Sequence, residues 1–219
     1  MSEQVYLNTG FKNIPINIEL NQFKNSKGFP YQGLWLFSGS QGFGKSLTLM
    51  GVLREMHAQY PDARIISNIS IFGLPCEPYQ GVEDFNKSNG ADGIIYVIDE
   101  IHTLFNSLES KSMPLSTVQV WCQNRKNRRV ILGTSQRFTR VAKPIREQCN
   151  LHYECLRPFF GIIRRYRVLD GSCYDDSGRY ISNDGRYPRP HWYIPSFNVL
   201  TGYNTLEVVK RNEYKEDDY

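Results

Sequence analysis

The sequence lacks the features that would assign it to a membrane, secreted or metal-binding class. No apolar run approaches the roughly 18–20 residues of a membrane-spanning helix. The N-terminal residues Met1-Ser2-Glu3-Gln4 do not form the basic and then apolar start of a signal peptide. The five cysteines form no C-x-x-C pair, and the four histidines show no ligand spacing, so we expect reduced thiols and histidines with surface or packing roles. These absences favour a cytoplasmic protein without a membrane span of its own.

The sequence also has no internal repeat and no strong excess of one charge. It has 219 residues, of which 40% are hydrophobic and 22% are charged, and a net charge of +4. This length suffices for one sizeable core, and the composition is that of an ordinary globular protein. We therefore expect one compact α/β unit with at most a small extension.

The most specific motif is a complete phosphate-binding loop of the form G-x-x-x-x-G-K-[ST]. Residues 39–46 read Gly39-Ser40-Gln41-Gly42-Phe43-Gly44-Lys45-Ser46. An apolar run over 33–38 precedes the loop, and a helical pattern follows it. Glycines let backbone N–H groups approach phosphates closely, while Lys45 can reach the β and γ phosphates and Ser46 can ligate Mg²⁺. The motif predicts binding of ATP with Mg²⁺.

A second apolar run, over 94–98, ends in Asp99 and Glu100, which is the pattern of a Walker B strand. A buried parallel strand delivers its terminal carboxylates to the edge of the sheet beside the phosphate loop. We expect Asp99 to hold Mg²⁺. We expect Glu100 to polarise the attacking water, a role that a hydrolase needs and a simple kinase does not.

A third apolar run, over 129–135, is followed by Gln136. Gln136 could sense the γ-phosphate or help to position water, although an ordinary polar residue at the end of a strand gives the same pattern. Three strands with these endings favour hydrolysis of a nucleoside triphosphate, with Lys45, Glu100 and Gln136 as the catalytic residues.

Strands and helices alternate along the chain. The expected strands are 33–38, 63–69, 94–98, 129–135 and 151–155, and the expected helices follow the loop, cover much of 104–128 and span 141–149. This alternation predicts a P-loop NTPase three-layer sandwich, an α/β fold with a mainly parallel sheet and a small β-rich C-terminal extension. We divide the chain into an N-terminal arm at 1–32, a P-loop ATPase core at 33–155, and a β-rich extension with an acidic tail at 156–219.

The segment from Asn124 to Arg146 is rich in basic residues and contains no Asp or Glu. Three interpretations stay open: contact with a nucleic-acid backbone, an arginine finger that reaches a neighbouring subunit's nucleotide, and a solvated basic face. The candidates for DNA contact are Arg125, Lys126, Arg128, Arg140 and Lys143. The candidates for the arginine finger are Arg128, Arg129 and Arg137.

The order of these motifs resembles that of the FtsK–HerA branch of P-loop motor ATPases, in which a Gln-Arg pair ends a strand after the Walker B acids. Here that strand end reads Thr134-Ser135-Gln136-Arg137. The block Val97-Ile98-Asp99-Glu100-Ile101-His102 is also similar to the Asp-Glu-Ala-His region of zonular-occludens-toxin-like phage ATPases. The resemblance covers about residues 33–155. It implies ATP hydrolysis with Mg²⁺ in a homo-oligomeric ring, where a neighbour's arginine completes each site.

The sequence also departs from these relatives. Toxin-like phage assembly ATPases usually carry a transmembrane segment and a periplasmic part, and FtsK carries membrane anchors and a DNA-reading domain; none is evident here. The motor core that is left looks most like compact viral genome-packaging ATPases, which implies translocation of double-stranded DNA into a capsid, in the host cytoplasm or in association with the virion. The alternative is a toxin-like phage assembly or secretion ATPase that works with a partner's membrane channel. A P-loop kinase is a further alternative, disfavoured by Glu100.

Overall fold

The computed structural model describes residues 28–105, 128–182 and 186–203. These residues form an eight-stranded sheet with the strand order β3-β2-β4-β5-β1-β6-β7-β8. The first six strands in this order, from β3 to β6 and including β1 and β2, are parallel to one another. Strands β7 and β8 continue the sheet in antiparallel orientation. The fold is therefore the expected α/β architecture, with a mainly parallel sheet and antiparallel C-terminal strands.

The central strands are β1 (Gly33–Ser38), β4 (Ile94–Ile98) and β5 (Arg129–Ser135). Every residue of β4 and β5 is buried. Near-continuous apolar runs are typical of parallel strands that are covered on both faces. This is why the sequence predicts the bounds of these strands so closely.

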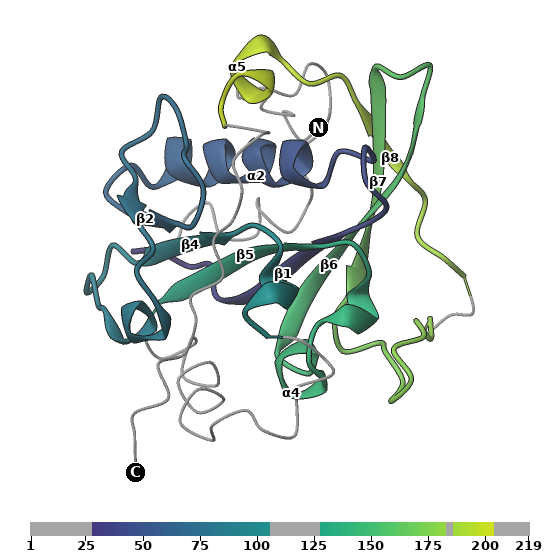
Figure 1. Ribbon diagram of the computed structural model, residues 1–219, viewed down its shortest axis with the longest axis horizontal. Coiled ribbons are helices and arrows are strands. Elements are labelled where there is room, and N and C mark those ends of the chain that lie inside the picture. Colours follow the sequence, from purple (N-terminus) through teal and green to yellow (C-terminus); the bar gives the residue numbers. More distant parts are fainter. Residues whose placement is uncertain (1–27, 106–127, 183–185, 204–219) are drawn as a thin grey trace, which may run out of the picture.

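Helix α2 (Lys45–Gln59) covers one face of the sheet (Figure 1). Trp35 of β1 packs into the core on the α2 side, whereas its neighbour Leu34 packs into the core on the other side, as the alternation of side chains along a strand requires. The second core includes Ile145 of the short helix α4 (Lys143–Arg146), which lies on the opposite side of the sheet from α2 in Figure 1.

The remaining elements border this framework. They are β2 (Arg64–Ser67), β3 (Glu77–Pro78), β6 (Cys149–Phe159), β7 (Ile163–Asp170), β8 (His191–Tyr193), helix α5 (Phe197–Leu200), and the 3-10 turns η1 (Val82–Asn86), η2 (Ile101–Thr103) and η4 (Phe138–Arg140). No helix in the described part of the chain has the length and apolar character needed to cross a bilayer.

Three expected elements differ in length from those of the structure. The strand expected over 63–69 is shorter at both ends, as β2 (Arg64–Ser67). The helix expected over 141–149 is wrong except for Lys143–Arg146, because Cys149 already belongs to β6. The strand expected over 151–155 is longer at both ends, since β6 continues to Phe159 to pair with β7. Most of the helical pattern over 104–128 lies outside the described residues.

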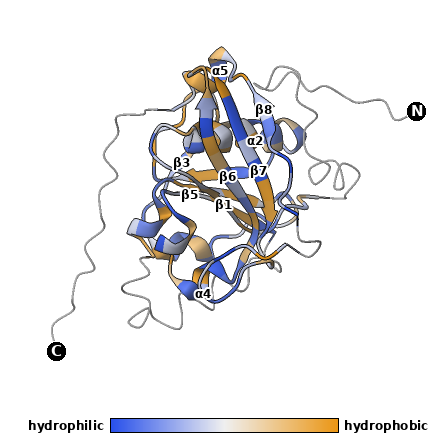
Figure 2. Cartoon of the chain, turned by 90° about the vertical axis from the view of Figure 1, so that its right-hand side faces the viewer, coloured by the Kyte–Doolittle hydropathy of each residue, from blue (hydrophilic) through white to orange (hydrophobic). Residues whose placement is uncertain are grey.

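The limits of the three expected sequence regions do not coincide with breaks in the sheet. Phe29 and Tyr31, from the expected N-terminal arm, are buried in the core on the α2 side. The limit after residue 155 falls inside β6. Strand β7 pairs with β6, and β8 pairs with β7, so the C-terminal strands extend the same sheet. Figure 2 views the molecule from the side on which these strands lie.

Candidate functional site

The phosphate-loop motif lies between the end of β1 at Ser38 and the start of α2 at Lys45. A loop that leads from a buried strand into a helix N-terminus is suited to bind phosphate. Two of its glycines meet geometric demands that other residues would not. Gly39 has φ of 148°, and a Cβ on it would lie 2.5 Å from the carbonyl oxygen of Cys155. Gly44 has φ of 89°, in the region that favours glycine.

The Lys45 side chain lies over the loop. Its Nζ donates to the carbonyl oxygen of Ser40 at 3.4 Å, and the residue is only 8% exposed. An ammonium group held by one long contact inside the loop is available to a phosphate bound there. The position therefore fits the role expected from the motif.

Asp99 lies beside the hydroxyl of Ser46. Ser46 Oγ donates to Asp99 Oδ1 at 3.2 Å, and Thr134 Oγ1 donates to the same oxygen at 2.7 Å. A hydroxyl and a carboxylate at one place form an oxygen donor set that Mg²⁺ accepts together with nucleotide phosphates and water. The residues present thus fit the cation, and Ser46 and Asp99 would hold it.

Asn68 and Thr134 hold the backbone of the Walker B acids, a role that the sequence analysis assigned to neither residue. Asn68 donates through Nδ2 to the Asp99 carbonyl at 3.0 Å and accepts from the Asp99 N–H at 2.8 Å. Thr134 Oγ1 accepts from the Glu100 N–H at 2.8 Å. Strands β2 and β5 flank β4 in the sheet. Polar residues at the carboxyl ends of neighbouring parallel strands meet at one edge of the sheet. Their positions at the ends of two expected strands could therefore have identified Asn68 and Thr134.

Glu100 combines an unusual backbone with a perturbed carboxyl group. Its φ of 51° and ψ of 47° are left-handed, which is uncommon outside glycine and is found at functional sites. Burial and then the charge of Asp99 raise the pKa of Glu100 above its usual value, while the charges of Lys45 and Arg140 oppose that rise. A carboxylate with a raised pKa is a better proton acceptor, as a general base requires.

His102 lies beside Glu100, a position that the sequence analysis did not assign to any histidine. Its Nδ1 lies 3.2 Å from Glu100 Oε2 and 3.3 Å from Ser135 Oγ. Because Ser135 Oγ gives its own proton to the carbonyl of Arg137 at 2.9 Å, its contact with His102 places a proton on Nδ1. Burial and then the charge of Arg140 lower the pKa of His102. The neutral ring therefore directs this N–H toward Ser135, and Glu100 Oε2 stays buried beside the ring without a hydrogen-bond partner among the described residues.

Gln136 is paired with an arginine of the same chain. Arg140 NH1 donates to Gln136 Oε1 at 2.7 Å. The positive charge of Arg140 lowers the pKa of both Glu100 and His102. The guanidinium therefore lies near these two side chains. The chain thus supplies a cation close to Glu100 in addition to Lys45, where the Walker motifs alone indicated none.

The three arginine-finger candidates lie at two ends of β5. Arg137 is exposed, follows the carboxyl end of the strand, and lines an open hollow of about 440 Å³ beside the phosphate loop. Arg128 and Arg129 lie at the opposite, amino end. Arg129 is only 1% exposed, so it cannot reach a neighbouring subunit while β5 stays in the sheet. Its burial speaks against the finger role that the sequence suggested.

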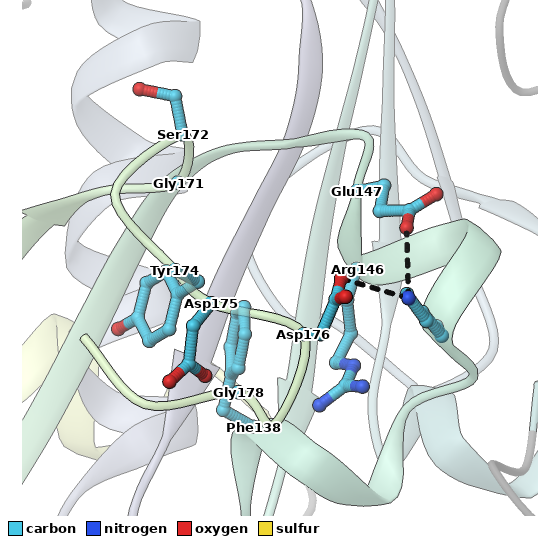
Figure 3. Close-up of a pocket in the computed structure, with 10 residues that line it drawn as sticks. Phe138, Arg146, Glu147, Gly171, Ser172, Tyr174, Asp175, Asp176 and Gly178 are labelled. Atoms are coloured by element: carbon cyan, nitrogen blue, oxygen red, sulfur yellow. Dashed lines mark hydrogen bonds and ion pairs between the residues drawn. The ribbon is translucent and has the colours of Figure 1, made fainter. Parts of the chain in front are cut away.

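The candidates for DNA contact do not form one surface among the described residues. Arg128 lies at the amino end of β5, whereas Arg140 belongs to the edge that carries Glu100. Lys143 forms ion pairs with Asp176 at 2.8 Å and with Glu147 at 3.9 Å, in a hollow between α4 and the segment 171–178 (Figure 3). Outside the described residues lie Arg125 and Lys126.

Residues from the C-terminal part of the chain also reach the loop. Arg164 NH1 donates to the Gly42 carbonyl at 2.9 Å. Burial and then the charge of Asp99 raise the pKa of Tyr203, and a hydrogen bond with Ser46 opposes that rise. No local sequence signal could have identified these contacts, because they depend on how β7 and β8 continue the sheet beyond β6.

Comparison with protein families gives one match. The family model described as "Zonular occludens toxin (Zot)" matches residues 52–182, which is more than half of the chain. The matched segment begins after the phosphate loop and contains Asp99, Glu100 and Gln136. No curated protein matches the sequence at a significant level.

Several solved structures share the fold. The N-terminal domain of zonular occludens toxin from Neisseria meningitidis aligns with a TM-score of 0.56 at 16% identity, covering 78% of this chain and 98% of that chain. The genome packaging NTPase B204 from Sulfolobus turreted icosahedral virus 2, in complex with ATP-gammaS, aligns with a TM-score of 0.51 at 11% identity, covering 74% and 97%. The DNA-packaging ATPase B204 from Sulfolobus turreted icosahedral virus has a TM-score of 0.51 at 10% identity, with the same coverage of 74% and 97%.

Proposed function

Because the chain belongs to the zonular occludens toxin family of P-loop ATPases, we propose that it hydrolyses ATP with Mg²⁺ to drive a phage assembly or secretion step. One observation carries the proposal, which is the arrangement of Ser46, Asp99 and Glu100 beside the phosphate loop. A hydroxyl and a carboxylate suited to Mg²⁺ lie next to a second carboxylate with a raised pKa. This second acid is the part that a hydrolase needs and a simple kinase does not.

In the proposed reaction the chain's own residues have separate tasks. The loop N–H groups and Lys45 bind the ATP phosphates. Ser46 and Asp99 would hold Mg²⁺, which would supply positive charge to those phosphates. Glu100 accepts a proton from the attacking water, and the ring of His102, 3.2 Å from Glu100 Oε2, helps to bury the carboxylate whose pKa is raised.

Arg140 is the proposed cation for the developing charge on the γ-phosphate. The pair of Arg140 with Gln136 holds the guanidinium at the end of β5, on the side of Glu100. A cation at this place would act within one chain, as an arginine supplied in cis does in other phosphoryl-transfer enzymes. A homo-oligomeric ring with a finger in trans is a separate proposal, for which exposed Arg137 is the better placed candidate.

The family match favours the toxin-like assembly or secretion role over viral genome packaging, which the sequence suggested first. The packaging NTPases share the fold at 10% and 11% identity, and such likeness carries no information about what is moved. We therefore propose a membrane-channel complex as the partner, and place translocation of double-stranded DNA second.

The products of the reaction test this proposal. The purified chain is incubated with ATP and Mg²⁺, with and without double-stranded DNA or a nucleoside acceptor, and ADP and free phosphate are quantified. We expect equal amounts of ADP and free phosphate, no phosphorylated acceptor, and loss of turnover on chelation of Mg²⁺. Phosphoryl transfer to the acceptor would contradict hydrolysis and support a kinase. Strong stimulation by DNA would instead favour the packaging role.

A further inference from the structure

We propose that the antiparallel strands β7 and β8 position the phosphate loop for its nucleotide, through Arg164 and Tyr193. This inference rests on the proposed function and extends it, because it gives these two strands a role in ATP binding. The phosphate-loop motif contains neither residue.

Arg164, in β7, lies against the glycine-rich part of the loop. Its NH1 donates to the Gly42 carbonyl at 2.9 Å, and its Cδ lies 3.1 Å from the place that a Cβ on Gly44 would take. Both glycines have positive φ, 79° and 89°. Glycines at such angles have no side chain to hold the backbone and many conformations to lose. A guanidinium bond to the carbonyl therefore limits the orientations open to this part of the loop.

The contact at Gly42 continues toward the catalytic lysine. The peptide group that joins Gly42 to Phe43 is bound on both sides, since the Phe43 N–H donates to the Ser40 carbonyl at 3.2 Å. The same Ser40 carbonyl accepts from Lys45 Nζ at 3.4 Å. A continuous series of contacts thus connects Arg164 with the ammonium group expected to bind the β and γ phosphates.

Tyr193, in β8, provides a second anchor, which acts on the Gly44 carbonyl through Thr48. The Tyr193 hydroxyl lies 2.8 Å from Thr48 Oγ1, which in turn donates to the Gly44 carbonyl at 2.9 Å. Because Thr48 uses its single hydroxyl proton on Gly44, Tyr193 acts as the donor to Thr48. Tyr193 is 2% exposed, so this contact is shielded from competing water.

Arg164→Ala tests the inference, with Arg165→Ala as the matched control. Arg165 is the next residue of β7, but its guanidinium donates to the Arg157 carbonyl and lies over the ring of Trp192. We expect Arg164→Ala to weaken binding of a fluorescent ATP analogue about tenfold, the order of one hydrogen bond to a charged group. KM should rise while kcat stays close to that of the unchanged protein, because the loop holds ground state and transition state alike. Arg165→Ala should leave both constants unchanged.

Two milder variants add specificity to the test. Arg164→Lys keeps the charge but loses the planar fork, so it should restore part of the affinity. Tyr193→Phe removes only a hydroxyl and should weaken binding less than Arg164→Ala. If Arg164→Ala does not fold, as judged by circular dichroism and thermal unfolding without nucleotide, these two variants decide the question.

The outcomes separate this inference from the proposed function. If the unchanged chain binds no ATP, the proposed function itself is wrong. If the unchanged chain binds ATP and folded Arg164→Ala binds it equally tightly, the inference about β7 and β8 is overturned and the proposed function stands. If Arg164→Ala does not fold, equally tight binding by Arg164→Lys and Tyr193→Phe has the same meaning.

Discussion

At the scale of single residues, the protonation state of Glu100 decides whether the site can accept a proton. Burial and the charge of Asp99 raise the pKa of Glu100, so its carboxylate is lost at a higher pH than that of an ordinary glutamate. The ring of His102 lies 3.2 Å from the same carboxylate, whose Oε2 atom is buried without a hydrogen-bond partner among the described residues. The activity of the site should therefore depend on pH through Glu100, whose pKa responds to the burial that His102 contributes.

We predict that kcat falls on the acid side as Glu100 becomes protonated. His102→Ala opens the buried carboxyl group to water, so the pKa of Glu100 falls and the acid limb of the kcat profile moves to lower pH. The measurement is kcat for ATP as a function of pH. His57→Ala, in the last turn of α2, is the control and should leave the profile in place. An acid limb that does not move in His102→Ala would contradict this role.

At the scale of elements, the carboxyl ends of β2, β4 and β5 are joined by side-chain to backbone hydrogen bonds. Asn68 bonds both the N–H and the carbonyl of Asp99, at 2.8 and 3.0 Å. Thr134 bonds the N–H of Glu100. The positions of both acids therefore depend on the neighbouring strands as well as on β4.

We predict that Asn68→Ala lowers the free energy of unfolding by about 1–3 kcal/mol, because two partly buried backbone groups lose their partner. It should also raise the Mg²⁺ concentration needed for ATP binding, since Asp99 is held less firmly. Urea unfolding and Mg²⁺-dependent nucleotide titration measure the two effects. Asn86→Ala is the control, because Asn86 only bonds Glu83 on the surface. An unchanged Mg²⁺ requirement in Asn68→Ala would show that Asn68 does not position Asp99.

The elements differ in how far the sequence alone could predict them. Strands β1, β4 and β5 follow from their apolar runs, and with them the places of Lys45, Asp99 and Glu100, since parallel strands end at one edge. The helix expected over 141–149 failed because its apolar residues also suit the start of β6. Local patterns do not distinguish a short buried strand from a buried helical turn.

The contacts of His102, Arg140 and Arg164 could not be predicted for a different reason. His102 reaches Glu100 through a left-handed residue followed by a 3-10 turn. Arg140 reaches Gln136 across another such turn, η4, and Arg164 of β7 meets Gly42, in the loop that follows β1, across the intervening strand β6. The first two contacts are local and depend on turns that no apolar pattern marks, whereas the contact of Arg164 depends on tertiary geometry.

At the scale of the whole molecule, one sheet carries both the expected ATPase core and the C-terminal strands. Strand β7 pairs with β6, and β8 pairs with β7. Phe29 and Tyr31 are part of the core on the α2 side of this sheet. The described residues thus include the phosphate-loop motif, an oxygen donor set suited to Mg²⁺, and the proposed base and cation. The ring, which is a separate proposal, would add a neighbour's arginine to this site.

We predict that mixing variants distinguishes an arginine acting in cis from one acting in trans. Lys45→Ala chains mixed with Arg137→Ala chains should recover part of the ATPase rate if Arg137 serves a neighbour's site, because some interfaces then combine two intact halves. Lys45→Ala mixed with Arg140→Ala should recover none, since each chain then has a defective site of its own. Recovery in the second mixture would contradict the cis role of Arg140. A rate per chain that is independent of concentration, with no recovery in the first mixture, would contradict the ring.

The central claim, that Glu100 activates water in an ATP site built from the phosphate loop and Asp99, is tested most directly by Glu100→Gln. Binding of ATP with Mg²⁺ and the steady-state rate of phosphate release are measured on this variant and on the unchanged protein. The amide keeps the shape of the side chain but cannot accept a proton. The proposed mechanism therefore predicts unchanged ATP affinity and a rate lower by at least about 100-fold. A folded Glu100→Gln protein that binds ATP and releases phosphate at the full rate would contradict the claim.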